Sequence, residues 1–234
     1  MNLRSILLGT AALLRLISLA PAAEGAPKAQ APDNFWVAAP RIIEGVADAL
    51  RPLGLMAAPP VSTWTVCIAE VLQSEGGFVN DARDPGGATN MGITRAVLAE
   101  WRGRPVSVAE VRALAQLEAR EIYRARYWNP IQGDALPAGL ALGLFDFAVN
   151  SGIKRAVRTL QQVMGFRPAD CDGVLGPATL RAIQRRDAAE LLAALCDARL
   201  AFLQALSTFG RFGRGWTARV KRVLASGRAQ MAIV

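Results

Sequence analysis

The chain between residues 75 and 94 reads Glu75-Gly-Gly-Phe-Val-Asn-Asp-Ala-Arg-Asp84-Pro-Gly-Gly-Ala-Thr89-Asn-Met-Gly-Ile-Thr94. Two glycines favour the end of a helix directly after Glu75, and a glycine-rich loop then carries Asp84 and Thr89. Cleavage of a glycosidic bond needs one protonated carboxylic acid beside the leaving oxygen and one ionised carboxylate across the sugar ring. An acid at a helix end and a second carboxylate in the following loop suit that chemistry.

The residues before Glu75 predict a helix over 62–75. Its apolar positions recur at helical spacing and form one stripe, which consists of Trp64, Cys67, Ile68, Val71 and Leu72. Position 75 falls on this stripe, so Glu75 is expected to point inward, whereas Glu70 lies off it and is expected to face solvent. Burial and the negative end of the helix dipole both favour the protonated form of Glu75, which is the form that a general acid needs.

The loop after Glu75 has two interpretations. Asp84 is surrounded by backbone N–H groups and is expected to stay ionised, where it could stabilise positive charge at the anomeric carbon or activate water, and Thr89 could hold a water molecule. Alternatively, Asp81 and Asp84 are simple turn formers, since Asp-Pro-Gly-Gly is a strong turn signal. The combination of acid, loop and second carboxylate is more specific than any of its parts.

The run from Glu75 to Thr94 resembles the signature of the glycoside hydrolase family 108 N-acetylmuramidases, which are peptidoglycan-cleaving endolysins and secretion-associated lysozymes. Two further segments match in the order and spacing of the family, Glu121-Ile-Tyr-Arg-Ala-Arg-Tyr-Trp128 and Phe145-Asp-Phe-Ala-Val-Asn-Ser-Gly152. The resemblance implies a lysozyme-like enzyme that hydrolyses the β-1,4 bond between N-acetylmuramic acid and N-acetylglucosamine. It also implies that Glu75 is the catalytic acid.

The catalytic candidates are therefore Glu75, Asp84 and Thr89. Their spacing is similar to the Glu, Asp, Thr arrangement of phage-type lysozymes, but the last gap is one residue shorter here. Thr94 consequently competes with Thr89 for the third position.

Five further residues are candidates for substrate binding: Asn90, Tyr123, Trp128, Asp146 and Asn150. Tyr123, Tyr127 and Trp128 could stack on sugar rings, although such residues more often belong to a core, and one of the three in the cleft is the expectation. Asp146 and Asn150 are four positions apart, so they share a helix face that could line a cleft across from Glu75. Asn150 could equally be a helix terminator.

The C-terminal part of the chain, residues 153–226, is expected to form a helical peptidoglycan-binding region. It contains Asp172-Gly-Val-Leu-Gly-Pro-Ala-Thr179 before a predicted helix, which resembles the region that accompanies these muramidases. Taken alone, this motif is a turn into a helix with Pro177 near its first position. The expected organisation is an N-terminal segment over 1–60, a catalytic domain over 61–152 and a wall-binding region over 153–226.

The hydrophobic pattern predicts a mainly α fold: a lysozyme-like helical domain with little or no sheet and the C-terminal helical region packed on it. Helices are expected over 62–75, 107–128 with a break near Ala115, 139–150, 153–164, 177–186, 187–208 and 215–226. The segment Leu140–Val149 is apolar nearly all round and is expected to be the central buried helix.

Basic residues concentrate in the C-terminal part of the chain. Residues 151–234 carry fourteen basic and five acidic side chains, whereas residues 61–150 carry eight and ten. Such a distribution suits a polyanionic matrix such as the bacterial cell wall, whose stem peptides carry carboxylates. Nucleic acid is the other polyanion to consider, but no helix-turn-helix or zinc pattern supports it, and we expect no nucleic acid partner.

The first 60 residues lie outside the resemblance. Residues 1–23 combine a basic residue, an apolar stretch and a small-residue cleavage site, which predicts export to the periplasm or cell wall. Arg15 interrupts the apolar stretch, so a signal-anchor with transient inner-membrane contact remains an alternative to a signal peptide. Residues 34–57 include one apolar helix face that could pack on the main domain or lie on a membrane.

The remaining residue types exclude several classes of enzyme. The chain has no histidine, which excludes Ser-His-Asp and Cys-His centres and the usual zinc hydrolase site. Three cysteines allow one disulfide at most, with Cys67 expected in the core and a pair between Cys171 and Cys196 left open. We expect no cofactor, no metal and a monomer. A lytic transglycosylase and a non-catalytic wall-binding adaptor are the alternatives to a muramidase.

Overall fold

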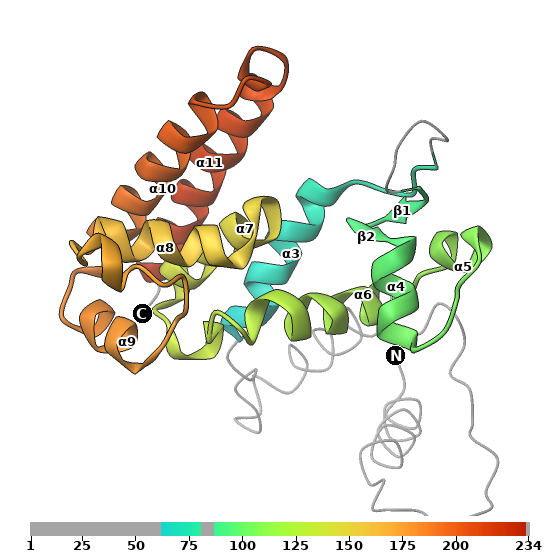
Figure 1. Ribbon diagram of the computed structural model, residues 1–234, viewed down its shortest axis with the longest axis horizontal. Coiled ribbons are helices and arrows are strands. Elements are labelled where there is room, and N and C mark those ends of the chain that lie inside the picture. The colour runs from blue at the N-terminus through green and yellow to red at the C-terminus, as the bar shows by residue number, and fades with distance from the viewer. Residues whose placement is uncertain (1–61, 81–86, 233–234) are drawn as a thin grey trace, which may run out of the picture. The chain divides into compact units, whose positions relative to one another are not determined.

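The computed structural model describes residues 62–80 and 87–232 (Figure 1). In chain order the elements are α3 (Thr63–Glu75), β1 (Thr89–Asn90), β2 (Ile93–Thr94), α4 (Arg95–Arg102), α5 (Val108–Arg112), α6 (Gln116–Tyr123), a π-helical turn (Arg124–Trp128), a 3₁₀ turn (Gly133–Ala135), α7 (Ala138–Ser151), α8 (Ile153–Val163), a second 3₁₀ turn (Pro168–Asp170), α9 (Pro177–Gln184), α10 (Ala188–Gln204) and α11 (Phe209–Met231). The expected N-terminal segment over 1–60, with its export signal and its short helix, lies outside the described residues, as does Asp84.

The mainly α fold is confirmed, because helices dominate the described residues and the only sheet there is a two-stranded hairpin. The break expected near Ala115 is present, since α5 ends at Arg112 and α6 begins at Gln116. Helix α4 was not predicted from the sequence. Helix α11 is longer at both ends than the expected 215–226, and its C-terminal end packs against α7 through Gly227 and Gly139 although it lacks an apolar repeat.

Helix α7 is the centre of the molecule, as its sequence predicts. All residues from Gly139 to Ala148 are buried, and α7 contacts α3, α8, α10 and α11. A helix that is covered on all sides has no need of a polar face, which explains its nearly continuous apolar sequence. Burial of its large side chains contributes about 1.5–3 kcal/mol each to the stability of the core.

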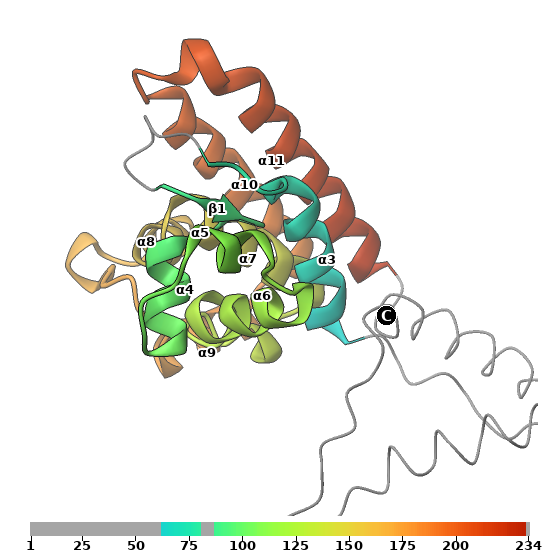
Figure 2. The same cartoon turned by 90° about the vertical axis from the view of Figure 1, so that its right-hand side faces the viewer.

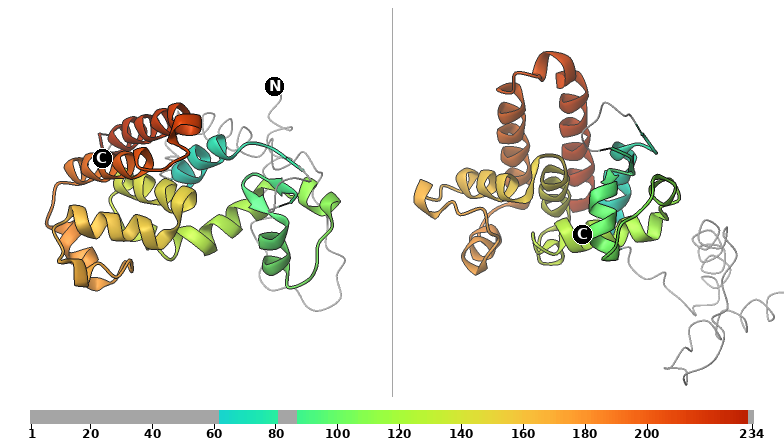
Figure 3. Two further views of the ribbon diagram at one scale, coloured as in Figure 1. Left: turned by 45° about the horizontal axis from the view of Figure 1, so that its top comes forward. Right: turned by 45° about the vertical axis from the view of Figure 1, so that its right-hand side comes forward.

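Helices α10 and α11 lie side by side as a hairpin that packs on α7 (Figures 1 and 3). The backbones of α7 and α11 approach each other most closely at two glycines, where a Cβ on Gly139 would collide with the carbonyl oxygen of Gly227. Residues Val61–Val234 cluster as one compact unit, so the C-terminal helices share a core with the part of the chain that carries Glu75. Among the described residues, no helix is both long enough and apolar enough to cross a membrane.

Candidate active site

Glu75 is the last residue of α3, and its carboxylate forms an ion pair with a helix from the other end of the chain. Glu75 Oε1 accepts a hydrogen bond of 2.7 Å from Arg219 Nη2 on α11. Both side chains are largely buried, with 18% of Glu75 and 14% of Arg219 exposed. Helices α3 and α11 pass each other at this point (Figure 2). The pair therefore fixes the orientation of the acid at the end of α3.

Arg219 is itself held by Asp146 of the central helix. Its Nε donates to both carboxylate oxygens of Asp146, at 3.1 and 2.9 Å, and Arg199 of α10 donates to the same carboxylate at 2.6 Å. Burial alone would lower the pKa of Arg219, but the charges of Asp146 and Glu75 and their hydrogen bonds outweigh it, so the pKa is raised. Asp146 is fully buried, which makes these two arginines the partners that its charge requires.

These contacts correct two expectations from the sequence. The expected surroundings of Glu75 were apolar, whereas the structure places the guanidinium of Arg219 in an ion pair with its carboxylate. Glu70 was expected to face solvent, yet only 17% of its side chain is exposed, because Arg222 of α11 donates to it at 2.8 Å. The apolar pattern of α3 gives no information about its polar residues, so it could not reveal that charged residues of α11 cover the face that carries Glu70.

The hairpin of β1 and β2 brings its turn against Glu75. Met91 and Gly92 both have positive φ, at 47° and 73°, which is the geometry of a two-residue type I′ turn. A Cβ on Gly92 would lie 2.8 Å from Glu75 Oε2 and would collide with the hydroxyl of Tyr123. The missing side chain therefore lets the turn, the acid and Tyr123 come together.

Tyr123 is buried beside Glu75, and its hydroxyl donates to the carbonyl oxygen of Met91 at 3.0 Å. Burial raises the pKa of Tyr123 well above its ordinary value, and the negative charge of Glu75 raises it further. The phenol is consequently neutral, and its hydroxyl anchors the hairpin turn at the end of α3.

Asn90 and the two threonines hold this hairpin in place. Asn90 is buried and donates to the carbonyl oxygens of Val111 and Arg112, both at 3.0 Å, which satisfies acceptors at the C-terminal end of α5. Thr89 and Thr94 are paired across the two strands. Thr94 caps α4 by accepting from a backbone N–H, whereas within residues 62–80 and 87–232 the Thr89 hydroxyl makes only a long contact of 3.4 Å with the Gly87 carbonyl. Of the two, the hydroxyl of Thr89 is therefore the less engaged.

The other sequence candidates are not gathered around Glu75 as one set. Trp128 is 1% exposed, donates to Asp134 and packs on Trp64, so its ring belongs to the core. Asn150 is exposed at the end of α7 and accepts from Ser151. Tyr127 is the one aromatic candidate of the three that is only partly buried, and its ring centroid lies 5.7 Å from that of Tyr123. It lies in the π-helical turn, a local feature that is frequent at functional sites.

Val79 and Thr89 lie on either side of residues 81–86, which are not described, and exchange two backbone hydrogen bonds of 2.8 Å. Two hollows within the described residues, one beside Arg155 and one beside Arg185, lie away from Glu75. The candidate site is thus defined by the contacts of Glu75, Arg219, Gly92 and Tyr123.

The three cysteines are buried and form no disulfide with one another. Cys67 lies in the core, as expected, and burial raises the pKa of its thiol to about 12. No group of three or more acidic or cysteine side chains that could hold a metal ion occurs within the described residues.

The sequence did not reveal the roles of Arg219, Arg199 and Gly92. Arg219 lies 144 positions from Glu75, and nothing nearby in the sequence separates it from the other arginines of α11. The one available signal was Asp146, because a carboxylate on a fully buried helix requires a cationic partner. That requirement predicts a buried arginine without saying which one.

Two of three comparisons with known proteins found matches to this chain. A family model described as "Glycosyl hydrolase 108" matches residues 68–152, and one described as "Predicted Peptidoglycan domain" matches residues 155–221. A solved structure titled "Structure of Brucella abortus SagA" has 50% sequence identity and a TM-score of 0.65, and the match covers 72% of this chain and 95% of that chain. A search of curated proteins found no match.

Proposed function

Because this chain belongs to the glycosyl hydrolase 108 family and is therefore a glycosidase with a peptidoglycan-binding region, we propose that Glu75 is its general acid. The substrate bond in this proposal is the β-1,4 bond between N-acetylmuramic acid and N-acetylglucosamine. The observation that carries the proposal is the position of Glu75, at a helix end where Arg219, Gly92 and Tyr123 fix its carboxylate. Peptidoglycan as substrate implies action in the periplasm or cell wall.

In the proposed reaction, Glu75 donates a proton to the glycosidic oxygen as the bond breaks. Asp84 stabilises the positive charge that develops at the anomeric carbon or activates the attacking water, and Thr89 holds that water. The distance between the two carboxylates decides between retention and inversion of configuration, since inverting enzymes leave room for a water molecule between them.

Arg219 has a defined part in this mechanism. It holds one oxygen of Glu75 while the other faces the Gly92 turn, so the acid keeps one orientation before substrate binds. Proton donation requires the neutral acid, so Glu75 must carry a proton when the glycosidic bond breaks.

The test is digestion of purified peptidoglycan by the parent protein and by the Glu75→Gln variant. Loss of a general acid is expected to slow cleavage by about a hundred- to ten-thousand-fold. Glu70→Gln is the matched control, because Glu70 also lies on α3, has nearly the same exposure and also pairs with an arginine of α11. Equal digestion by the parent and Glu75→Gln, or equal losses in both variants, would contradict the assignment of Glu75.

Mass spectrometry of the products decides which bond is broken and how. A muramidase leaves N-acetylmuramic acid at the reducing end, and that sugar takes up two hydrogens on borohydride reduction. A lytic transglycosylase instead leaves a 1,6-anhydro sugar that borohydride does not reduce, and a glucosaminidase leaves N-acetylglucosamine at the reducing end. Either of the last two products would overturn the proposed reaction while leaving the family membership unchanged.

A further inference from the structure

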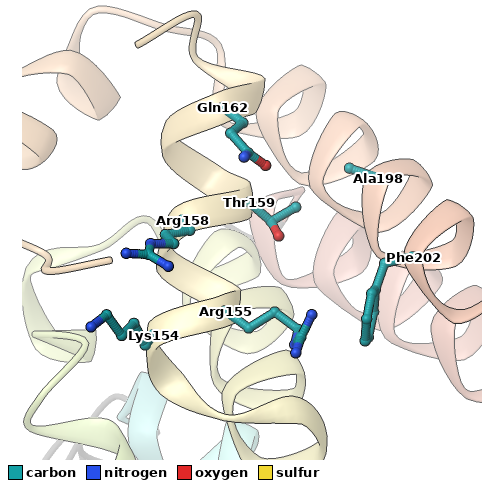
Figure 4. Close-up of a pocket in the computed structure, with 7 residues that line it drawn as sticks. All are labelled: Lys154, Arg155, Arg158, Thr159, Gln162, Ala198 and Phe202. Carbon is teal, nitrogen blue, oxygen red and sulfur yellow. The ribbon is translucent and has the colours of Figure 1, made fainter. Parts of the chain in front are cut away.

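A hollow of about 450 Å³ lies between α8 and α10, far along the chain from Glu75. We call it the α8–α10 hollow. Three cations of α8 line it, Lys154, Arg155 and Arg158, together with Phe202 of α10. Figure 4 shows Arg155 on the side of α8 that faces Phe202, and Lys154 and Arg158 along the other side of the same helix. Arg155 is therefore the cation that faces α10 across the hollow, and Lys154 and Arg158 complete its lining on α8.

None of these three cations forms an ion pair within residues 62–80 and 87–232, in contrast to Arg199 and Arg219 of the same region, although Arg158 and Asp172 interact through their charges. Like charges three and four positions apart on a helix repel each other, so this arrangement costs stability. An anion bound in the hollow reduces that cost. All three residues are exposed, so a solvated basic face is the alternative, and the contacts of their side chains with the rest of the protein favour a binding site.

All three residues are exposed, but each side chain also makes one contact with the rest of the protein. The guanidinium of Arg155 lies 4.3 Å above the ring of Phe202, and Arg158 Nε donates to the Cys171 carbonyl at 2.9 Å. The stem of Lys154 packs on Gly173, where a Cβ would lie only 2.7 Å from Lys154 Cγ. Binding an anion here therefore loses little side-chain entropy.

Gly173 belongs to the Asp172-Gly-Val-Leu-Gly-Pro motif that the sequence analysis singled out. Gly173 has a φ of 77° and donates its N–H to Gln161 on α8, and the Gln161 side chain donates to Asp172. The loop is thus fastened to the helix that carries the cations. The Asp172-Gly-Val-Leu-Gly-Pro motif therefore does more than lead into α9, because its loop also sets the positions of Lys154 and Arg158.

We propose that the α8–α10 hollow binds the free carboxylates of peptidoglycan stem peptides. The inference rests on the proposed function, which supplies peptidoglycan as the substrate. Arginine binds carboxylates through two parallel hydrogen bonds, and Thr159 and Gln162 line the same hollow as hydrogen-bonding groups for a peptide backbone. Nucleic acid fits less well, because base stacking needs an open aromatic face and Arg155 covers that of Phe202.

The direct test is binding of a soluble stem tetrapeptide, L-alanyl-γ-D-glutamyl-meso-diaminopimelyl-D-alanine, to the full chain by calorimetry. The hollow variant carries Lys154→Ala, Arg155→Ala and Arg158→Ala. The matched control carries Lys221→Ala, Arg211→Ala and Arg214→Ala, which removes one exposed lysine and two exposed arginines from α11. We expect the hollow variant to bind the tetrapeptide at least about tenfold more weakly and the control to bind it like the parent.

Two further probes make the result specific. The tetrapeptide with all its carboxylates amidated is expected to lose binding to the parent, and equal binding of both peptides would overturn the carboxylate assignment. Single-stranded DNA is the second polyanion tested. If the hollow variant loses binding of DNA but keeps binding of the tetrapeptide, nucleic acid replaces the stem peptide as the ligand. A single Arg155→Gln variant repeats the comparison in case the triple variant does not fold.

Cleavage of glycan strands without stem peptides separates this inference from the proposed function. We expect the parent and the hollow variant to cleave such strands at the same rate, because the hollow binds the peptide and Glu75 acts on the sugar bond. A parent that cleaves these strands but does not bind the tetrapeptide contradicts the hollow inference alone. A parent that binds the tetrapeptide through the three cations but cleaves no peptidoglycan contradicts the proposed function alone.

Discussion

Gly92 leaves the space that the carboxylate of Glu75 occupies, although the two residues are not neighbours in the sequence. Gly92 has a φ of 73°, and its missing Cβ leaves room for Glu75 Oε2 and the Tyr123 hydroxyl. Both neighbours are the ends of side chains, so they can move when a methyl group is added. The clash would therefore be relieved by displacing the carboxylate, and the effect should appear in activity more than in stability.

We predict that Gly92→Ala reduces peptidoglycan cleavage by about a hundredfold, because a displacement of about 1 Å at a reacting group has that effect. Gly103→Ala is the control, since Gly103 has a φ of 65° but nothing within 4 Å of its Cβ position. Each variant should lose about 1 kcal/mol of unfolding free energy from backbone strain. Cleavage rates and urea unfolding of both variants test this. Equal cleavage by the two variants would show that the turn does not position Glu75.

At the same scale, the sequence singles out Glu75 as the candidate acid but does not reveal the residues that contact it. The helix end, the glycine pair and the family signature identify Glu75 locally, because all of them lie within twenty residues. Arg219 and Arg199 depend on how α10 and α11 pack on α7, and no local pattern encodes that packing. The core position of Trp128 likewise follows from its contacts with Trp64 of α3 and Phe145 of α7, two elements that are distant in sequence from each other.

At the scale of elements, helices with a clear apolar stripe were predicted well and those without one were not. The apolar run of α7 predicts its central position, and its buried residues match that run. Helix α4 has only eight residues and buries only Leu98 fully, so its sequence contains too few core positions to be recognised as a helix. The hairpin was missed because a two-residue strand gives no alternating pattern, and its turn places Met91 at positive φ where glycine or asparagine would be the usual signal.

The crossing of α7 and α11 gives a prediction for element packing. In Gly139→Ala the new methyl group meets the backbone carbonyl of Gly227, which cannot move without shifting α11. We expect a loss of about 1–3 kcal/mol in the free energy of unfolding. Gly215→Ala is the control, because Gly215 lies within α11 with nothing within 4 Å of its Cβ position, and it should gain up to about 1 kcal/mol. Urea unfolding monitored by circular dichroism measures both changes.

If Gly139→Ala leaves the free energy of unfolding as high as Gly215→Ala does, the two helices do not approach closely at Gly139. The comparison is informative because both substitutions are glycine to alanine within a helix. Their intrinsic helix propensities change by the same amount, so the difference between them reports the contact alone.

At the scale of the whole molecule, the two matched family segments meet between residues 152 and 155 but share one core. Helix α7 ends the first segment, and its faces are covered by the second, with Gly143 against Leu192 and the ring of Phe147 6.2 Å from that of Phe202. Within residues 62–80 and 87–232, the charge of Asp146 is likewise balanced only by Arg199 and Arg219. We infer that the catalytic and wall-binding regions fold as one unit, although they carry different functions.

A chain that ends after Gly152 should therefore not fold. It would expose the apolar faces of α7 and would leave Asp146 without either cation, and removing the partners of a buried charge costs about 3–5 kcal/mol in itself. Since that loss is comparable to the stability of many whole domains, we expect the truncated chain to bind a hydrophobic dye and to unfold without a cooperative transition. Urea unfolding of the truncated and full chains provides the comparison. A cooperative transition in the truncated chain would establish instead that residues up to 152 form an independent domain, and that α10 and α11 only cover it.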